Sequence, residues 1–272
     1  MHRNGSQEPT SRLEEGNIQC QHASESDIMT EHPTYSVVIP VFNSEKSLEE
    51  LCRGLESVFS EMEQSCELIF VDDGSRDQSW KVLQTLREQR PEEIRIVRLT
   101  GNTGQQRATL SGLSFASGRR ILTIDDDLQH PPAEIKKLHA AFEESGADLV
   151  YGIFREKRHS RWRNAGSRAL KRSARWLHCS AGEGSSFRLI RRTMIQQILD
   201  HPQRFLFLDE RFQRVTRNIA FTQVEHHPRR YGASGYTSRK LAGLTATILF
   251  SACLRLFSAA VNSADHNMTR PG

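Results

Sequence analysis

The sequence predicts an α/β protein whose central sheet is open and mostly parallel. Between positions 35 and 151, five short β-rich runs alternate with segments of helical periodicity. This alternation is typical of repeated strand, helix, strand units, whose strands are parallel and buried on both faces. A chain of 272 residues with 37% hydrophobic and 26% charged residues is also long and apolar enough for one sizeable core.

The expected strands are apolar runs at residues 35–41, 68–71, 94–99, 121–124 and 148–151. Between the first two, apolar side chains recur every three or four residues over positions 48–62, which predicts a helix with one buried stripe. Gly118 and Gly146 stand where helices are expected to end before the next strands. The polar segments after the strands then form the carboxyl-end loops, where open α/β sheets bind ligands.

Both ends of the chain differ in composition from this alternating region. Residues 1–33 are polar, lack the patterns of a signal or transit peptide, and are predicted to be a disordered tail. Residues 231–263 are predicted to form an amphipathic juxtamembrane helical region, followed by a disordered tail at 264–272. The apolar run 241–262 would be about 33 Å long as a helix, but Arg255 interrupts it, which favours an interfacial helix over a membrane span.

Composition and missing motifs exclude several classes of protein. The five cysteines form no C-x-x-C pair, so neither a zinc cage nor a disulfide framework is predicted, and a reducing cytosol fits best. The net charge of +4 is too mild to predict nucleic-acid binding by the whole molecule. No H-E-x-x-H, G-x-S-x-G or P-loop motif occurs, and the glycine fingerprint at 182–187 lacks its third glycine. These absences argue against a zinc protease, a hydrolase, an ATPase and a dehydrogenase.

Three consecutive acids follow the fourth expected strand. They are Asp125, Asp126 and Asp127, with Gln129 two residues later. Carboxylates gathered at one sheet edge repel one another unless a cation lies between them, and their oxygens suit Mg²⁺ or Mn²⁺. The alternative is a solvated acidic turn that caps the helix expected to open at Pro131.

A second acidic turn follows the second expected strand, in the run Asp72, Asp73, Gly74. Asp73 could accept the N–H of a nucleobase, and Gly74 would allow close backbone approach. The alternative is an ordinary capping and turn device. Because carboxyl ends of parallel strands meet at one edge, the two acidic turns together predict a ligand site.

The order of these motifs resembles family 2 glycosyltransferases, and most of all their polyprenyl-phosphate branch, which includes dolichol-phosphate mannose synthases and undecaprenyl-phosphate sugar transferases. The motifs are I-P-x-F-N at 39–43, V-D-D-G-S at 71–75, N-x-G at 102–104, D-D-D-L-Q-H-P-P at 125–132 and S-F-R-L at 186–189. The resemblance covers about residues 35–255. It implies an inverting transferase with a GT-A fold over residues 34–230.

The resemblance also implies roles for particular residues. A divalent ion, Mg²⁺ or Mn²⁺, would be held by Asp125, Asp127 and Gln129. Catalysis would involve Asp125, Asp127, Arg155, Arg188 and Glu183, with the two arginines contacting phosphates. The nucleotide-sugar would be bound by Pro40, Phe42, Asn43, Glu45, Asp73, Asn102, Gly104, Asp125 and Asp126.

The sequence departs from the family pattern in three places. Ser44 stands where the common motif has a glutamate, with Glu45 one step later. Glu183 stands near where relatives usually carry an aspartate in the acceptor loop. Many bacterial relatives continue into transmembrane helices, whereas this chain ends at Gly272, so a truncated or peripheral form is expected.

A basic stretch over residues 155–176 predicts contact with an anionic membrane. Nine lysines and arginines alternate there with Trp162, Leu170 and Trp176. Each basic residue near an anionic surface contributes about 1 kcal/mol, and tryptophans favour the interface. The alternatives are a solvated charged helix and an RNA-binding segment, although no nucleic-acid module accompanies the charges.

The sequence therefore predicts transfer of a sugar from a UDP- or GDP-linked donor to a polyprenyl phosphate. The enzyme would be cytoplasmic and peripheral at the inner face of the membrane, would bind no nucleic acid, and could form a homo-oligomer. One alternative is transfer to a soluble glycan or protein hydroxyl, which needs a carboxylate base such as Glu183, Asp209 or Glu210. Another is an inactive homologue that only binds a nucleotide-sugar.

Overall fold

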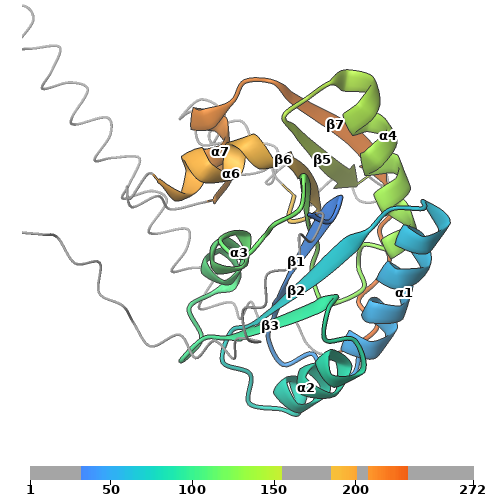
Figure 1. The fold of residues 1–272 in the computed structure, drawn as a ribbon, viewed down its shortest axis with the longest axis vertical. Helices are drawn as coiled ribbons and strands as arrows, with labels where there is room; N and C mark the ends of the chain where they lie inside the picture. Colours follow the sequence, from blue (N-terminus) through green and yellow to red (C-terminus); the bar gives the residue numbers. More distant parts are fainter. Residues whose placement is uncertain (1–31, 155–184, 201–207, 232–272) are drawn as a thin grey trace, which may run out of the picture. The chain divides into compact units, whose positions relative to one another are not determined.

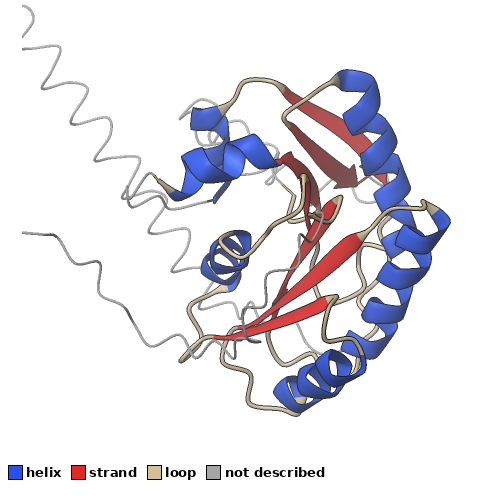
Figure 2. Ribbon diagram, in the orientation of Figure 1, coloured by secondary structure: helices blue, strands red, loops and turns tan. Residues whose placement is uncertain are grey.

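The computed structural model describes residues 32–154, 185–200 and 208–231. In this part, helices cover both faces of one central sheet (Figures 1 and 2). Several predicted features lie outside the described residues: most of the N-terminal tail, the basic stretch 155–176, Arg155, Glu183, the apolar run 241–262 and the C-terminal tail.

The sheet of the described region has seven strands in the order β3-β2-β1-β4-β6-β5-β7. Neighbours β3, β2, β1 and β4 are parallel, as are β5 and β7, whereas β6 runs antiparallel to both β4 and β5. The prediction of an α/β fold with a mostly parallel sheet is therefore confirmed. The strands are β1 (Tyr35–Val41), β2 (Cys66–Asp72), β3 (Ile94–Arg98), β4 (Arg120–Thr123), β5 (Leu149–Phe154), β6 (Arg188–Arg191) and β7 (Ile219–Val224).

Two groups of helices pack on opposite faces of the sheet (Figure 1). Side chains alternate between the faces along each strand, so Val37 and Ile39 of β1 join one core while Val38 joins the other. The first core contains α1 (Leu48–Glu61), α2 (Ser79–Gln89) and α4 (Ile135–Ser145), the last preceded by a 3-10 turn, η1 (Pro132–Glu134). The second contains α3 (Gln105–Leu113), α6 (Arg192–Leu199) and α7 (Leu208–Val215).

The five predicted strands and the first helix are confirmed, with ends that differ by at most three residues. Gly146 ends α4 in the left-handed conformation, with φ of 60°, as predicted. The prediction for Gly118 was wrong, because α3 already ends at Leu113. A Cβ on Gly118 would lie 2.6 Å from the backbone nitrogen of Ser36, so this glycine permits close approach to β1. No helix within the described ranges is long and apolar enough to cross a membrane.

The carboxyl ends of the parallel strands lie at one edge of the sheet. The last residues of β1 and β2, Val41 and Asp72, are register partners, and Asp72 in turn pairs with Arg98 at the end of β3. Beyond the ladder, the Asp73 amide donates to the Val41 carbonyl at 2.8 Å. The turn after β2 is therefore held beside the turn after β1.

Candidate active site

The acidic turn after β4 is fastened to the turn after β1. The Phe42 amide donates to Asp126 Oδ2 at 3.0 Å, and Ser47 Oγ donates to the Asp126 carbonyl at 2.6 Å. Leu128 has a φ of 59°, a left-handed conformation that costs energy for a leucine. Such a backbone persists only where its surroundings fix it, so the turn has one defined shape.

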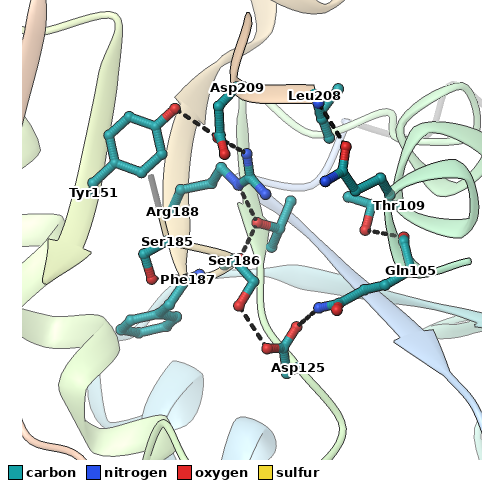
Figure 3. Close-up of polar contacts among 12 residues, drawn as sticks. Gln105, Thr109, Asp125, Tyr151, Ser185, Ser186, Phe187, Arg188, Leu208 and Asp209 are labelled. Atoms are coloured by element: carbon teal, nitrogen blue, oxygen red, sulfur yellow. Dashed lines mark hydrogen bonds and ion pairs between the residues drawn. The ribbon is translucent and has the colours of Figure 1, made fainter. Parts of the chain in front are cut away.

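The Asp125 carboxylate is held from two sides (Figure 3). Ser186 Oγ donates to Oδ2 at 2.5 Å, and Gln105 Nε2 donates to Oδ1. Burial raises the pKa of Asp125 to about 6, and the Asp127 charge adds to this rise. Hydrogen bonds from Ser186 and Gln105 and the charge of Arg188 act in the opposite direction. Neither Gln105 nor Ser186 was singled out as a contact of this acid from the sequence.

Asp126 shares this desolvated environment. Burial raises its pKa to about 7, hydrogen bonds from Ser44 and Phe42 oppose the rise, and the charges of Asp125 and Asp127 add to it. Ionisation of Asp125 and Asp126 is therefore less favourable than in water, and positive charge near the turn promotes it.

Asp127 meets positive charge from another part of the chain. Arg229 Nη2 and Nε lie 2.7 and 3.2 Å from Asp127 Oδ2, while Oδ1 accepts the Gln129 amide at 3.0 Å. The segment that carries Arg229 is fastened to the same turn, since the His227 amide donates to the Gln129 carbonyl at 2.9 Å. Sequence reasoning missed Arg229, whose only local signal is the pair of histidines, proline and pair of arginines at 226–230.

These residues fit a divalent ion that is completed by a ligand rather than caged by protein. The described residues contain no group of three or more His, Cys, Asp or Glu side chains placed to hold a metal. Asp125, Asp127 and Gln129 nevertheless supply hard oxygen donors on one turn that already attracts a cation. Mg²⁺ typically takes one or two carboxylates together with waters and substrate phosphate oxygens.

The turn after β2 is tied to the loop before α3 by Asp73. This buried carboxylate accepts the Thr103 amide at 2.7 Å, the Thr103 hydroxyl at 2.8 Å and the Gly104 amide at 2.8 Å. Gly74 has a φ of +71°, and a Cβ there would lie 2.9 Å from the Gly101 backbone. Asp73 thus shapes the loop that carries Asn102 and Gly104, and its nucleobase contact stays a prediction.

Four more residues assigned to the nucleotide lie at the end of β1 or in the turn that follows it. Pro40 is buried within β1, whereas Phe42 is 37% exposed beside the acidic turn. Asn43 has a φ of 54°, and its side-chain oxygen accepts the Arg76 amide at 2.8 Å. Glu45 Oε2 accepts the Gln78 amide at 2.9 Å, so it caps α2. Their contacts with a nucleotide-sugar also stay predictions.

Arg188 is buried at the start of β6, and its guanidinium is already paired. Its Nη1 lies 2.6 Å from Asp209 Oδ1, an oxygen that also accepts the Tyr151 hydroxyl at 2.9 Å. Arg188 Nε donates to Thr123 Oγ1 at 3.1 Å. Protonation of Asp209 would leave a buried, unpaired arginine, which argues against Asp209 as a general base. The phosphate contact expected for Arg188 stays a prediction.

The α/β sheet with two acidic turns at one carboxyl edge has a GT-A-like fold, and solved structures show the same fold. Glucosyl-3-phosphoglycerate synthase from Mycobacterium tuberculosis, in complex with Mn²⁺, UDP and phosphoglyceric acid, matches with a TM-score of 0.56 and 21% identity. The match covers 81% of this chain and 78% of that one. The same enzyme in complex with Mg²⁺ and UDP matches with a TM-score of 0.56 and 20% identity, over 81% and 79% of the two chains.

Sequence comparison defines the family. Glycosyl transferase family 2 matches residues 36–205. Undecaprenyl-phosphate 4-deoxy-4-formamido-L-arabinose transferase of Pseudomonas aeruginosa (strain LESB58) is 34% identical over 228 residues, covering 82% of this chain and 67% of that protein. The transferase of the same name from Proteus mirabilis (strain HI4320) is 36% identical over 233 residues, covering 82% and 70%. The chain therefore belongs to glycosyl transferase family 2 and is a glycosyltransferase.

Proposed function

We propose that this enzyme transfers a sugar from a UDP- or GDP-linked donor to a polyprenyl phosphate at the cytoplasmic face of the membrane. The observation that carries the proposal is the 34% identity, over 82% of this chain, to a transferase named for undecaprenyl phosphate. A match over 82% of this chain necessarily includes both acidic turns.

The donor would lie at the carboxyl edge, with its nucleotide near Phe42, Asn43 and Asp73 and its diphosphate near the acidic turn after β4. Solved neighbours in complex with UDP and Mn²⁺ or Mg²⁺ support a donor site that also takes a divalent ion. Asp125, Asp127 and Gln129 would hold the divalent ion. When bound, that ion supplies Lewis-acid stabilisation of the departing diphosphate.

A phosphate acceptor suits this site because three of its carboxylates already accept hydrogen bonds or form ion pairs and are not free to act as a base. Asp73 accepts three hydrogen bonds, Asp127 pairs with Arg229, and Asp209 pairs with Arg188. A phosphate monoester with a second pKa near 6 is largely ionised at neutral pH, so it needs no base. Its oxygen would attack the anomeric carbon with inversion, while the bond from that carbon to the diphosphate oxygen breaks and the nucleoside diphosphate leaves with the electron pair.

Transfer of labelled sugar to three kinds of acceptor tests the proposal. Purified protein would receive UDP- and GDP-linked sugars with Mn²⁺ and either undecaprenyl phosphate, undecaprenol or soluble glycans. We expect product with undecaprenyl phosphate alone, and we expect Glu183→Gln to retain it. Transfer to a hydroxyl acceptor that Glu183→Gln abolishes would instead establish a base-assisted enzyme. Donor binding without either transfer or hydrolysis would indicate an inactive homologue.

A further inference from the structure

We propose that Asp209 is a positioning residue for sugar transfer and holds the Asp125 carboxylate in place through a chain of hydrogen bonds that begins at Arg188. The inference rests on the proposed function for its catalytic consequence. It gives Asp209, at the start of α7, a role other than that of a base. Figure 3 labels Arg188 on β6, Asp209 on α7 and Gln105 on α3. It also labels Ser186, on the loop before β6, and Asp125, on the turn after β4.

The chain of contacts runs from α7 to the acidic turn without a break. Asp209 Oδ1 accepts Arg188 Nη1 at 2.6 Å, and Arg188 Nε donates to Thr123 Oγ1 at 3.1 Å. Thr123 Oγ1 in turn donates to the Ser186 carbonyl at 2.5 Å. Ser186 Oγ then donates to Asp125 Oδ2 at 2.5 Å.

The Thr123 hydroxyl gives the chain its direction. A hydroxyl has one proton to donate and lone pairs with which to accept. Because Arg188 Nε donates into the Thr123 oxygen, the hydroxyl proton is directed to the Ser186 carbonyl. The main chain at Ser186 is thereby fixed where its own hydroxyl reaches Asp125. Arg188 is buried, so its orientation depends on Asp209 rather than on solvent.

A second series of hydrogen bonds connects the start of α7 to the Asp125 carboxylate through α3. The Leu208 amide, next to Asp209, donates to Gln106 Oε1 at 2.8 Å. The neighbouring Gln105 donates through its side chain to Asp125 Oδ1. Both oxygens of Asp125 are therefore held by residues whose positions are coupled to the start of α7 (Figure 3).

Such support matters because displacement of a reacting or ligating group by about 1 Å can cost about 100-fold in rate. Asp125 stands on a turn after a strand that ends at Thr123. Holding its carboxylate from β6 and α3 restricts the rotation that a turn residue would otherwise have.

Substitutions along this series of hydrogen bonds distinguish a role in positioning Asp125 from a role in the stability of the whole protein. Thr123→Val removes the hydroxyl but keeps the shape and leaves the Asp209 ion pair intact, and Thr123→Ser restores the hydroxyl. Asp209→Asn removes the charge that holds Arg188. Tyr151→Phe is the matched control, since it removes a hydrogen bond to the same Asp209 oxygen without touching the path to Asp125.

Two readouts decide the proposal. Hydrogen–deuterium exchange of the peptide covering residues 185–191 should quicken in Thr123→Val and Asp209→Asn but stay near wild type in Thr123→Ser and Tyr151→Phe. With the best donor and acceptor, kcat should fall about 10- to 100-fold in the first two variants. Each variant should still unfold in one cooperative thermal transition above the assay temperature, so that a lower kcat does not reflect loss of the fold.

Unchanged exchange at 185–191 in Thr123→Val would overturn the proposal, as would wild-type kcat in that variant. Equal losses of activity in Thr123→Val and Tyr151→Phe would also overturn it, because they would indicate a merely structural network. If the wild-type protein transfers no sugar, the proposed function fails, and the exchange comparison still decides whether Asp209 positions Ser186.

Discussion

Replacing Arg229 by alanine should make the protein bind Mn²⁺ more tightly and, without metal, make it less stable. The Arg229 guanidinium lies 2.7 Å from Asp127 Oδ2, and an ion that takes Asp127 as a ligand has to displace or share that contact. Asp127 is 8% exposed, but the Arg229 side chain is 34% exposed, so water screens part of the pair. A charge-assisted contact of this kind contributes about 1–2 kcal/mol net, or roughly 5- to 30-fold in an equilibrium constant.

Calorimetric titration with Mn²⁺ at pH 8 should therefore give a dissociation constant about 5- to 30-fold lower for Arg229→Ala than for wild type. Urea denaturation in EDTA should show a loss of about 1–2 kcal/mol in the free energy of unfolding. Arg230→Ala is the matched control, because the neighbouring Arg230 pairs with Glu50 instead, and it should change neither quantity. Equal or weaker Mn²⁺ binding by Arg229→Ala would refute the competition for Asp127.

Three further predictions concern the turn after β2, the buried cysteines and binding to membranes. Asp77 also holds a turn, because its carboxylate accepts the Glu45 and Ser79 amides. Asp73→Ala should weaken binding of UDP or GDP, measured by calorimetry, more than Asp77→Ala does, and equal effects would show that Asp73 is only a turn residue. Burial raises the pKa of the Cys52 and Cys66 thiols to about 12, so folding favours the neutral thiols. The alkylation rate of these two cysteines in the folded protein should therefore be low at pH 8 and still increase with pH at pH 10. In the urea-unfolded chain, the alkylation rate should instead stop increasing above the ordinary thiol pKa. An alkylation rate that stops increasing at the same pH in the folded protein would contradict the burial of the two thiols. From the basic stretch 155–176, we expect anionic liposomes to sediment the protein at low salt and added salt to release it, whereas indifference to lipid charge would favour a soluble acceptor.

The parallel part of the fold was predictable because its signals are local. Strands β1 to β5 are apolar runs bounded by polar turns, and α1 has a regular buried stripe. The strand β6 carries no such signal, since its four residues begin and end with arginine. Its insertion between β4 and β5 depends on contacts between distant segments, which no local pattern encodes.

The candidate site likewise contains residues that could be predicted from the sequence and residues that could not. Asp73 directly follows β2 and Asp125 lies two residues after the end of β4, so strand direction alone places them at one edge. Their supporting partners could not be predicted, because Gln105, Ser186 and Arg229 reach the acidic turn from separate elements. Motif order identified Arg188, but only the structure shows that it is buried against Asp209.

Anomalous diffraction from crystals grown with Mn²⁺ and a nucleoside diphosphate tests the central claim most directly. That claim is that the acidic turn after β4 holds the donor diphosphate through a divalent ion. The account predicts a manganese peak within bonding distance of Asp127 and of the diphosphate oxygens, with Arg229 moved away from Asp127 Oδ2. A bound nucleotide without manganese at this turn, and with the contact between Arg229 and Asp127 intact, would contradict the account.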